Sequence, residues 1–215
     1  MKRFAFTLAE VLITLAIIGV VAALTLPTLI HNYQKKVLEV QFKKSYSNLQ
    51  NVINSVNTEN GEPFDCYFLK GGGFHYSQCT QFYEEFFKKL QVVKICNFKQ
   101  TNCFGQYKTR EQVLAEGGKS LSQACSYPMS GSTAYNLNDG SMLYVLETTD
   151  GGFNNQNAVF IGIDVNGKKG PNRWGYDLFY LNLLKKDQTA SVIPLTYMCE
   201  LIEKGGRSAE EILQK

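Results

Sequence analysis

The residues best suited to chemistry lie in the loop from Asp164 to Asp177. Together with Asn166, these aspartates offer side-chain oxygens, and glycines between them let the loop bend. Hard cations such as calcium bind several oxygens of this kind, so the sequence makes Asp164, Asn166 and Asp177 candidate calcium ligands. The loop is not an EF-hand, because position twelve from Asp164 is Gly175, and two lysines inside it oppose a cation. The alternative is a plain turn whose Asp and Asn side chains bond their own backbone.

A second chemically unusual residue is Glu10, the one acid in an apolar run from Phe4 to Ile30. At 1.5 Å rise per residue, a helix over this run spans the roughly 30 Å core of a bilayer. Lys2 and Arg3 precede the run, and the positive-inside rule keeps them cytoplasmic. The sequence therefore predicts a membrane-spanning helix with the rest of the chain outside the cytoplasm.

Three explanations of this segment compete. An ordinary signal peptide would be cut near Ala23, but the apolar run continues past that point. A simple membrane anchor fits the length of the run. It does not explain Glu10, because an acid inside a spanning helix is costly and usually has a partner. Cleavage before Phe6 would instead create an α-ammonium group four residues from Glu10. In a filament, Glu10 of one subunit could then neutralise the Phe6 amine of its neighbour and set the axial register.

The run Ala5-Phe6-Thr7-Leu8-Ala9-Glu10-Val11 resembles the cleavage and methylation motif of type IV prepilins and type II secretion pseudopilins. The resemblance implies that prepilin peptidase cuts before Phe6, that Phe6 is N-methylated, and that Glu10 serves assembly. Pro27 falls where many members have a helix-kinking proline. The residue before the cut is Ala5, where the family usually has glycine. Implied partners are prepilin peptidase, the inner membrane and other pilin or pseudopilin subunits.

Six cysteines follow the apolar run, and an even number after an export signal predicts disulfides in an oxidising compartment. Six cysteines allow 15 pairings; neighbouring positions favour Cys66–Cys79 and Cys96–Cys103, which leaves Cys125–Cys199. The alternative is free buried thiols. Zinc is disfavoured, because no pair has CxxC spacing and the histidines are only His31 and His75.

The elements that must position these residues form an α+β fold: a long N-terminal helix packed on a small antiparallel sheet, as in pilins. The helix should end by Asn60-Gly61, and a further helix is expected over 81–93. Strands are expected at 134–137, 141–147, 159–165 and 177–184, with a capping box at Ser208 and Glu211 opening a short last helix. The predicted domains are a leader at 1–5, a membrane or filament-core helix at 6–30, an amphipathic helix at 31–60 and a disulfide-rich head at 61–215.

Composition and motifs give no support to catalysis or nucleic-acid binding. The 22 basic and 19 acidic residues give a net charge of +3, which becomes +1 once the leader with Lys2 and Arg3 is removed. No long basic run is present. No G-x-S-x-G, P-loop or H-E-x-x-H motif occurs, so the chain is not expected to be an enzyme.

The sequence is best explained as a structural subunit of a type II secretion pseudopilus. The loop from Asp164 resembles the calcium-binding β-loop of the major pseudopilin. One alternative is a type IV or competence pilin with a role in adhesion or DNA uptake. Another is a membrane-anchored periplasmic binding domain that does not polymerise. The expected location is a single pass through the bacterial inner membrane with the head in the periplasm, followed by a periplasmic or extracellular filament.

Overall fold

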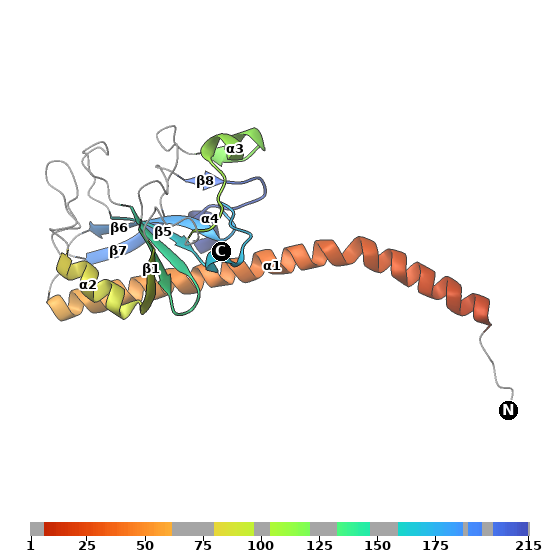
Figure 1. Ribbon diagram of the computed structural model, residues 1–215, viewed down its shortest axis with the longest axis horizontal. Helices are drawn as coiled ribbons and strands as arrows, with labels where there is room; N and C mark the ends of the chain where they lie inside the picture. Colours follow the sequence, from red (N-terminus) through yellow and green to blue (C-terminus); the bar gives the residue numbers. More distant parts are fainter. Residues whose placement is uncertain are drawn as a thin grey trace, which may run out of the picture. The chain divides into compact units, whose positions relative to one another are not determined.

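A computed structural model describes residues 7–61, 80–96, 104–120, 133–146, 159–186, 189–194 and 200–214 (Figure 1). The chain divides into two compact units, Met1–Val37 and Leu38–Lys215. The first unit is the N-terminal part of a long helix, and the second carries the rest of that helix and the sheet. Antiparallel sheet plus long helix gives the α+β, pilin-like architecture that the sequence predicts.

The long helix α1 runs from Leu8 to Asn60. It ends where predicted: Gly61 has φ 83°, a conformation that suits glycine just after a helix, and its N–H bonds to the carbonyl of Thr58. Pro27 lies inside α1, which continues past it without a break. A kink at Pro27 itself stays a prediction.

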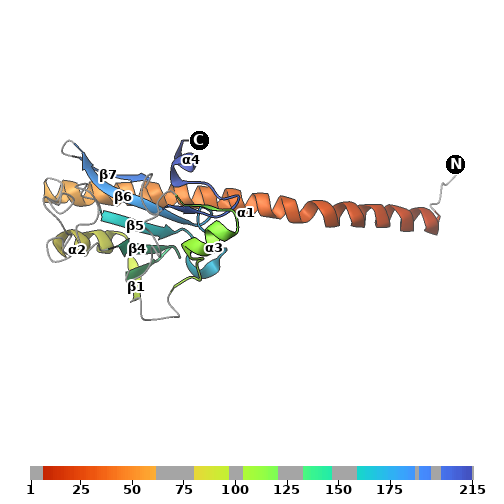
Figure 2. The same cartoon turned by 90° about the horizontal axis from the view of Figure 1, so that it is seen from above.

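The sheet of the second unit has six strands among the described residues, in the order β1-β3-β4-β5-β6-β7. Every neighbouring pair is antiparallel. The strands are β1 (Val92–Cys96), β3 (Thr133–Leu137), β4 (Met142–Leu146), β5 (Val159–Asp164), β6 (Leu178–Lys186) and β7 (Thr189–Pro194). A separate pair joins β2 (Lys119–Ser120) to β8 (Leu201–Ile202). Figure 2 shows the sheet lying along the C-terminal half of α1.

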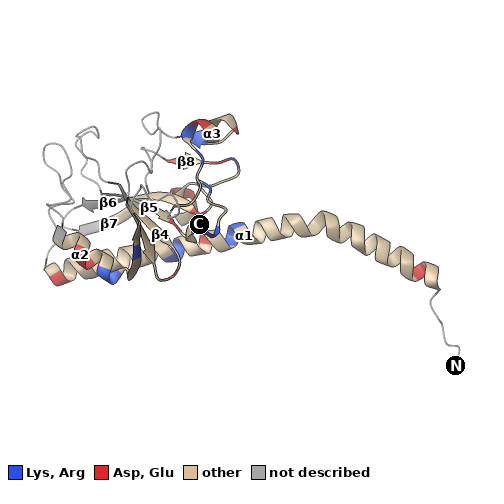
Figure 3. Ribbon diagram, viewed as in Figure 1, with Lys and Arg blue, Asp and Glu red and all other residues tan. Residues whose placement is uncertain are grey.

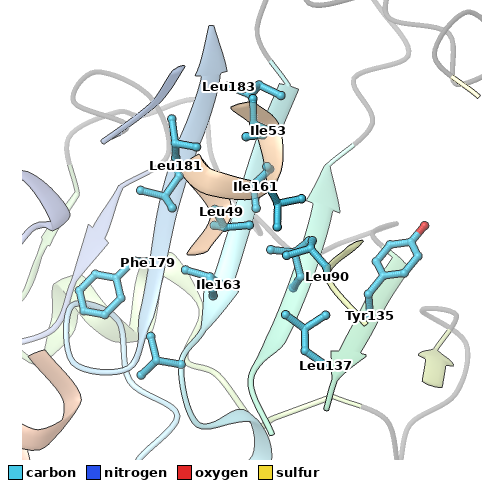
Figure 4. Packing of buried hydrophobic residues seen from close by; sticks show 14 of the residues in the cluster. Leu49, Ile53, Leu90, Tyr135, Leu137, Ile161, Ile163, Phe179, Leu181 and Leu183 are labelled. Carbon is cyan, nitrogen blue, oxygen red and sulfur yellow. The ribbon is translucent and has the colours of Figure 1, made fainter. Parts of the chain in front are cut away.

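One face of the sheet packs on α1 and α2 (Thr80–Lys89). The part of α1 expected to be amphipathic, 31–60, buries one row of apolar side chains: Phe42, Leu49, Ile53 and Val56 are at most 2% exposed. Each such side chain stabilises the fold by about 1.5–3 kcal/mol. Figure 4 shows the partners of the helix, which are the inward residues of the central strands Ile161, Ile163, Phe179, Leu181 and Leu183.

The opposite face carries an aromatic cluster. Tyr144, Trp174 and Tyr180 are at most 2% exposed, and Phe104 and Tyr107 pack against them. The segment that delivers Tyr107 continues into α3 (Arg110–Ala115), whose N-cap is Thr109. The sheet is therefore covered on both faces, by helices on one and by a loop segment on the other.

The sequence prediction was wrong at the end of the second helix. The helix stops at Lys89, Gln91 adopts φ 57°, and the chain continues as strand β1. Three of the four residues in 92–95 are β-branched, which fits a strand next to β3 better than a helix end. The hairpin β3–β4, strands β5 and β6, and the last helix α4 (Ala209–Leu213) are confirmed.

Candidate functional site

The first candidate site is the start of α1, where Thr7 and Glu10 form a capping box. The carboxylate Oε2 of Glu10 accepts hydrogen bonds from the backbone N–H of Thr7 at 2.8 Å and from its hydroxyl at 2.7 Å. In return, the N–H of Glu10 lies 3.3 Å from Oγ1 of Thr7. This arrangement satisfies N–H groups that a helix start otherwise leaves without partners. The acid is thus bound within its own chain, a role that the sequence argument did not identify although T-x-x-E is its signature.

The segment that follows Glu10 presents apolar side chains outward. Leu15, Ile18, Leu24 and Leu29 are between 59% and 74% exposed. Helix α1 is long and apolar enough to cross a membrane, with a mean hydropathy of 2.4 in its most apolar window. In Figure 3, no Lys, Arg, Asp or Glu colours this part of the α1 ribbon after its acidic start. Such a surface is stable only when lipid or other apolar helices cover it.

The predicted cleavage residues Ala5 and Phe6 lie outside the described residues. Pro27 is exposed within α1. The described geometry therefore places Glu10 at the first turn of an apolar helix, and the proposed partner of Glu10, the amine of a neighbouring Phe6, stays a prediction.

The second candidate site is the loop between β5 and β6. Asp164 ends β5 and Asp177 precedes β6, and both are fully buried. The strands pair Asp164 with Leu178, and the N–H of Val165 bonds to the carbonyl of Asp177, so the two aspartates sit at the closing end of the loop. Gly167 is required there, because at φ 60° a Cβ would lie 2.6 Å from the carbonyl oxygen of Gly140.

Hydrogen-bond donors face all four carboxylate oxygens of the two aspartates. Asp177 accepts the backbone N–H groups of Asn172 at 2.7 Å and Arg173 at 2.6 Å, one on each oxygen. Asp164 accepts the N–H of Asn166 at 3.2 Å on Oδ1 and the hydroxyl of Tyr107 at 2.5 Å on Oδ2. The Tyr107 hydroxyl also lies 2.8 Å from that of Tyr144.

A third acid, Glu203, completes the surroundings of the loop and is only 2% exposed. Its Oε1 accepts the N–H of Trp174 at 3.2 Å, and its Oε2 accepts Nε of Arg173 and Nζ of Lys108, each at 3.0 Å. Nε1 of Trp174 donates to the carbonyl of Lys108 at 2.9 Å. The segment 104–109, the loop and the chain after β8 are therefore joined through one buried carboxylate.

Burial sets the electrostatics of the loop. It raises the pKa of Asp164 to about 8, with a further contribution from the charge of Asp177. The pKa of Asp177 is raised as well, mainly by burial and against the effect of its backbone hydrogen bonds. Burial and the neighbouring Asp164 raise the pKa of Tyr107, which keeps its hydroxyl protonated as a donor. Two buried carboxyl groups close together favour the proton-rich state unless other positive charge compensates.

The predicted calcium ligands are brought to one place, but their surroundings do not suit a cation. Calcium is bound by oxygen lone pairs that face the ion, and here N–H and O–H groups face the carboxylates. Within the described ranges, no group of three or more His, Cys, Asp and Glu side chains is arranged to hold a metal. One feature does favour a bound metal ion: the side-chain amide oxygens of Asn166 and Asn172 are buried and have no hydrogen-bond partner. Calcium at Asp164, Asn166 and Asp177 stays a prediction.

One of the six cysteines can be placed. Cys96 ends β1, is fully buried and is disulfide-bonded. The remaining five, Cys66, Cys79, Cys103, Cys125 and Cys199, lie outside the described residues, so the predicted pairings stay predictions. His31 is exposed on α1, and His75 also lies outside the described residues.

Three residues of the site were not predicted from the sequence: Tyr107, Lys108 and Glu203. Tyr107 is 57 residues from its partner Asp164, and Glu203 is 30 residues from its partner Arg173. No periodicity links such positions. One signal was present: Thr109 and Gln112 form a capping box that marks the start of α3 and therefore an ordered segment around Tyr107.

Comparison with known proteins bears on the N-terminus. Residues 1–26 match the family described as the prokaryotic N-terminal methylation motif. This motif is the hallmark of prepilin-type proteins, the type IV pilins and pseudopilins. No curated protein and no solved structure matches the chain.

Proposed function

We propose that the chain is a structural subunit of a type II secretion pseudopilus or a closely related type IV pilus-like filament. The observation that carries the proposal is the prepilin methylation motif at residues 1–26 on a helix whose apolar side chains point outward. Prepilin peptidase would cut between Ala5 and Phe6, and Phe6 would then be N-methylated. The subunit assembles through α1 and performs no catalysis.

In this proposal, the precursor sits in the inner membrane by its apolar helix, and the head lies in the periplasm. Cleavage exposes the amine of Phe6, and Glu10 of a neighbouring subunit pairs with it while apolar helices cover each other's exposed side chains. The pairing matters because each charge alone would be stranded among apolar groups. Within this proposal, the resemblance of the head loop to that of the major pseudopilin favours the pseudopilus over a pilus.

Cleavage and assembly are tested separately. The full chain is produced with and without prepilin peptidase, and intact mass determines whether the first five residues are lost and a methyl group gained. Filament incorporation of Glu10→Gln is compared with that of Glu84→Gln, which changes an exposed acid on α2. We expect normal cleavage of both variants and a loss of incorporation for Glu10→Gln alone. A mature chain that begins near Ala23, or equal incorporation of both variants, would overturn the proposal.

A further inference from the structure

We infer that the hydroxyl of Tyr107 holds the loop Asp164–Asp177 closed in the way that a bound cation would, so that this head folds without calcium. The inference concerns the head alone and is independent of the proposed role in a filament. The sequence predicted calcium in this loop, whereas N–H and O–H donors face the two buried carboxylates.

Hydrogen-bond donors already occupy the carboxylates of the loop. Each of the four oxygens of Asp164 and Asp177 accepts a donor, at distances from 2.5 to 3.2 Å. Three of these donors are backbone N–H groups of the loop itself, at Asn166, Asn172 and Arg173. A loop can place its own N–H groups in this way with no ion, and buried acids in proteins are stabilised by such bonds.

The fourth donor, the hydroxyl of Tyr107, comes from outside the loop. Tyr107 comes from a segment distant in sequence, and its hydroxyl reaches Oδ2 of Asp164 across the second face of the sheet. The residue after Tyr107 is fixed at two points, because Trp174 of the loop donates to the carbonyl of Lys108 and the Lys108 side chain donates to Glu203. Tyr107 therefore does what a shared ion does, which is to tie a carboxylate of the loop to a group outside it.

Removal of the Tyr107 hydroxyl would leave one oxygen of Asp164 without a hydrogen-bond donor. With phenylalanine at position 107, Oδ2 of Asp164 loses its donor and remains buried. A buried carboxylate oxygen without a partner is costly, and an added cation would restore one. Oδ2 of Asp164 and the unpartnered amide oxygens of Asn166 and Asn172 would then be available to a hard cation, while the three backbone N–H groups keep the other aspartate oxygens. Tyr107→Phe should therefore create the calcium dependence that the natural chain lacks.

The experiment measures thermal unfolding of the full chain in detergent, in millimolar calcium and in chelator. Trp174 is the single tryptophan and is 1% exposed within this loop, so its fluorescence reports the loop directly. We expect the natural chain to melt at the same temperature in both buffers. Tyr107→Phe should melt lower by about 5 °C in chelator and recover much of that loss in calcium.

Two further variants keep the result specific. Tyr176→Phe also removes a buried tyrosine hydroxyl in this region, one that donates to the carbonyl of Lys204 and not to an aspartate, and it should stay indifferent to calcium. Asp164→Asn added to Tyr107→Phe should abolish the recovery in calcium. A natural chain that melts higher in calcium than in chelator would overturn the inference, and so would a Tyr107→Phe variant that is destabilised and unaffected by calcium.

Discussion

Oε2 of Glu10 lies 2.8 Å from the backbone nitrogen of Thr7 and 2.7 Å from its hydroxyl oxygen, which closes a capping box at the start of α1. The acid that is proposed to pair with a neighbouring subunit is thus already held by two donors of its own chain. Thr7 orients the carboxylate at the first turn of the helix and reduces the cost of keeping it among apolar groups.

This relationship predicts that Thr7→Val lowers filament incorporation. The substitution keeps the shape of the side chain and removes one donor to Glu10 and the acceptor for its N–H, a loss of about 1 kcal/mol or roughly fivefold in an equilibrium. The measurement is the ratio of assembled to cleaved membrane-bound subunit, by quantitative immunoblot. Thr25→Val is the control, because the Thr25 hydroxyl bonds only to the carbonyl of Val21 in its own helix. Equal ratios for the two variants would show that the capping box has no part in assembly.

An ion pair between Arg207 and Glu39 leads to a second prediction, for the stability of the head. Nη1 of Arg207 lies 2.7 Å from Oε1 of Glu39, and both side chains are less than a third exposed. Arg207 also donates from Nη2 to the carbonyl of Glu211 in α4, so it fastens the C-terminal segment to α1. We expect a double-mutant cycle with Glu39→Gln and Arg207→Met to give a coupling of about 0.5–1.5 kcal/mol in urea unfolding.

The comparison for this pair is Lys89–Glu59, which joins the ends of α2 and α1 and in which Glu59 is 59% exposed. Its coupling should be smaller and should vanish in high salt, because exposed pairs are screened. Two equal couplings would argue that the link between α4 and α1 is held by apolar packing alone.

Glu200 gives a prediction for pH. Its side chain is 7% exposed, and burial raises its pKa from 4.5 to about 7, with smaller contributions from the charges of Glu211 and Glu210. A raised folded-state pKa means that the stability due to the protonated form is present below pH 4.5 and is lost as pH rises through about 7. Glu200→Gln cannot ionise and keeps an oxygen for the N–H of Ala209.

We therefore expect Glu200→Gln to exceed the natural chain in unfolding free energy by less than about 1 kcal/mol at pH 5 and by about 2–3 kcal/mol at pH 8. Chemical unfolding at both pH values measures this difference. Glu84→Gln, on an exposed face of α2, should change neither value. A gain of the same size at pH 5 would mean that the glutamine packs better and that ionisation is not the cause.

The cysteines give a prediction that peptide mapping can check. Cys96 is buried and disulfide-bonded, and proximity in sequence favours Cys103 as its partner. We expect the exported protein to contain no alkylatable thiol before reduction and to yield a linked peptide that contains Cys96 and Cys103. A linked peptide with another partner would correct the pairing, and free thiols after export would contradict the predicted disulfide framework.

The sequence by itself determined the features that depend on neighbouring residues. Four such features arise from local composition, turn geometry or hydrogen bonds within four residues. They are the apolar run with one acid, the end of α1 at Asn60, the hairpin between β3 and β4, and the Ser208–Glu211 capping box. The same local reasoning failed over 90–93, because a short apolar stretch fits a helix or a strand until a partner strand is known.

Only the tertiary structure decided what surrounds Asp164 and Asp177. The sequence placed both aspartates in one loop and left two explanations open, a bound cation and a plain turn, but the hydroxyl of Tyr107 and the carboxylate of Glu203 arrive from other segments. Such contacts carry no periodic signal, because their geometry is set by how the sheet and the segment 104–109 pack on each other. Whether a carboxylate faces an ion or a hydrogen-bond donor depends on that packing, and composition cannot reveal it.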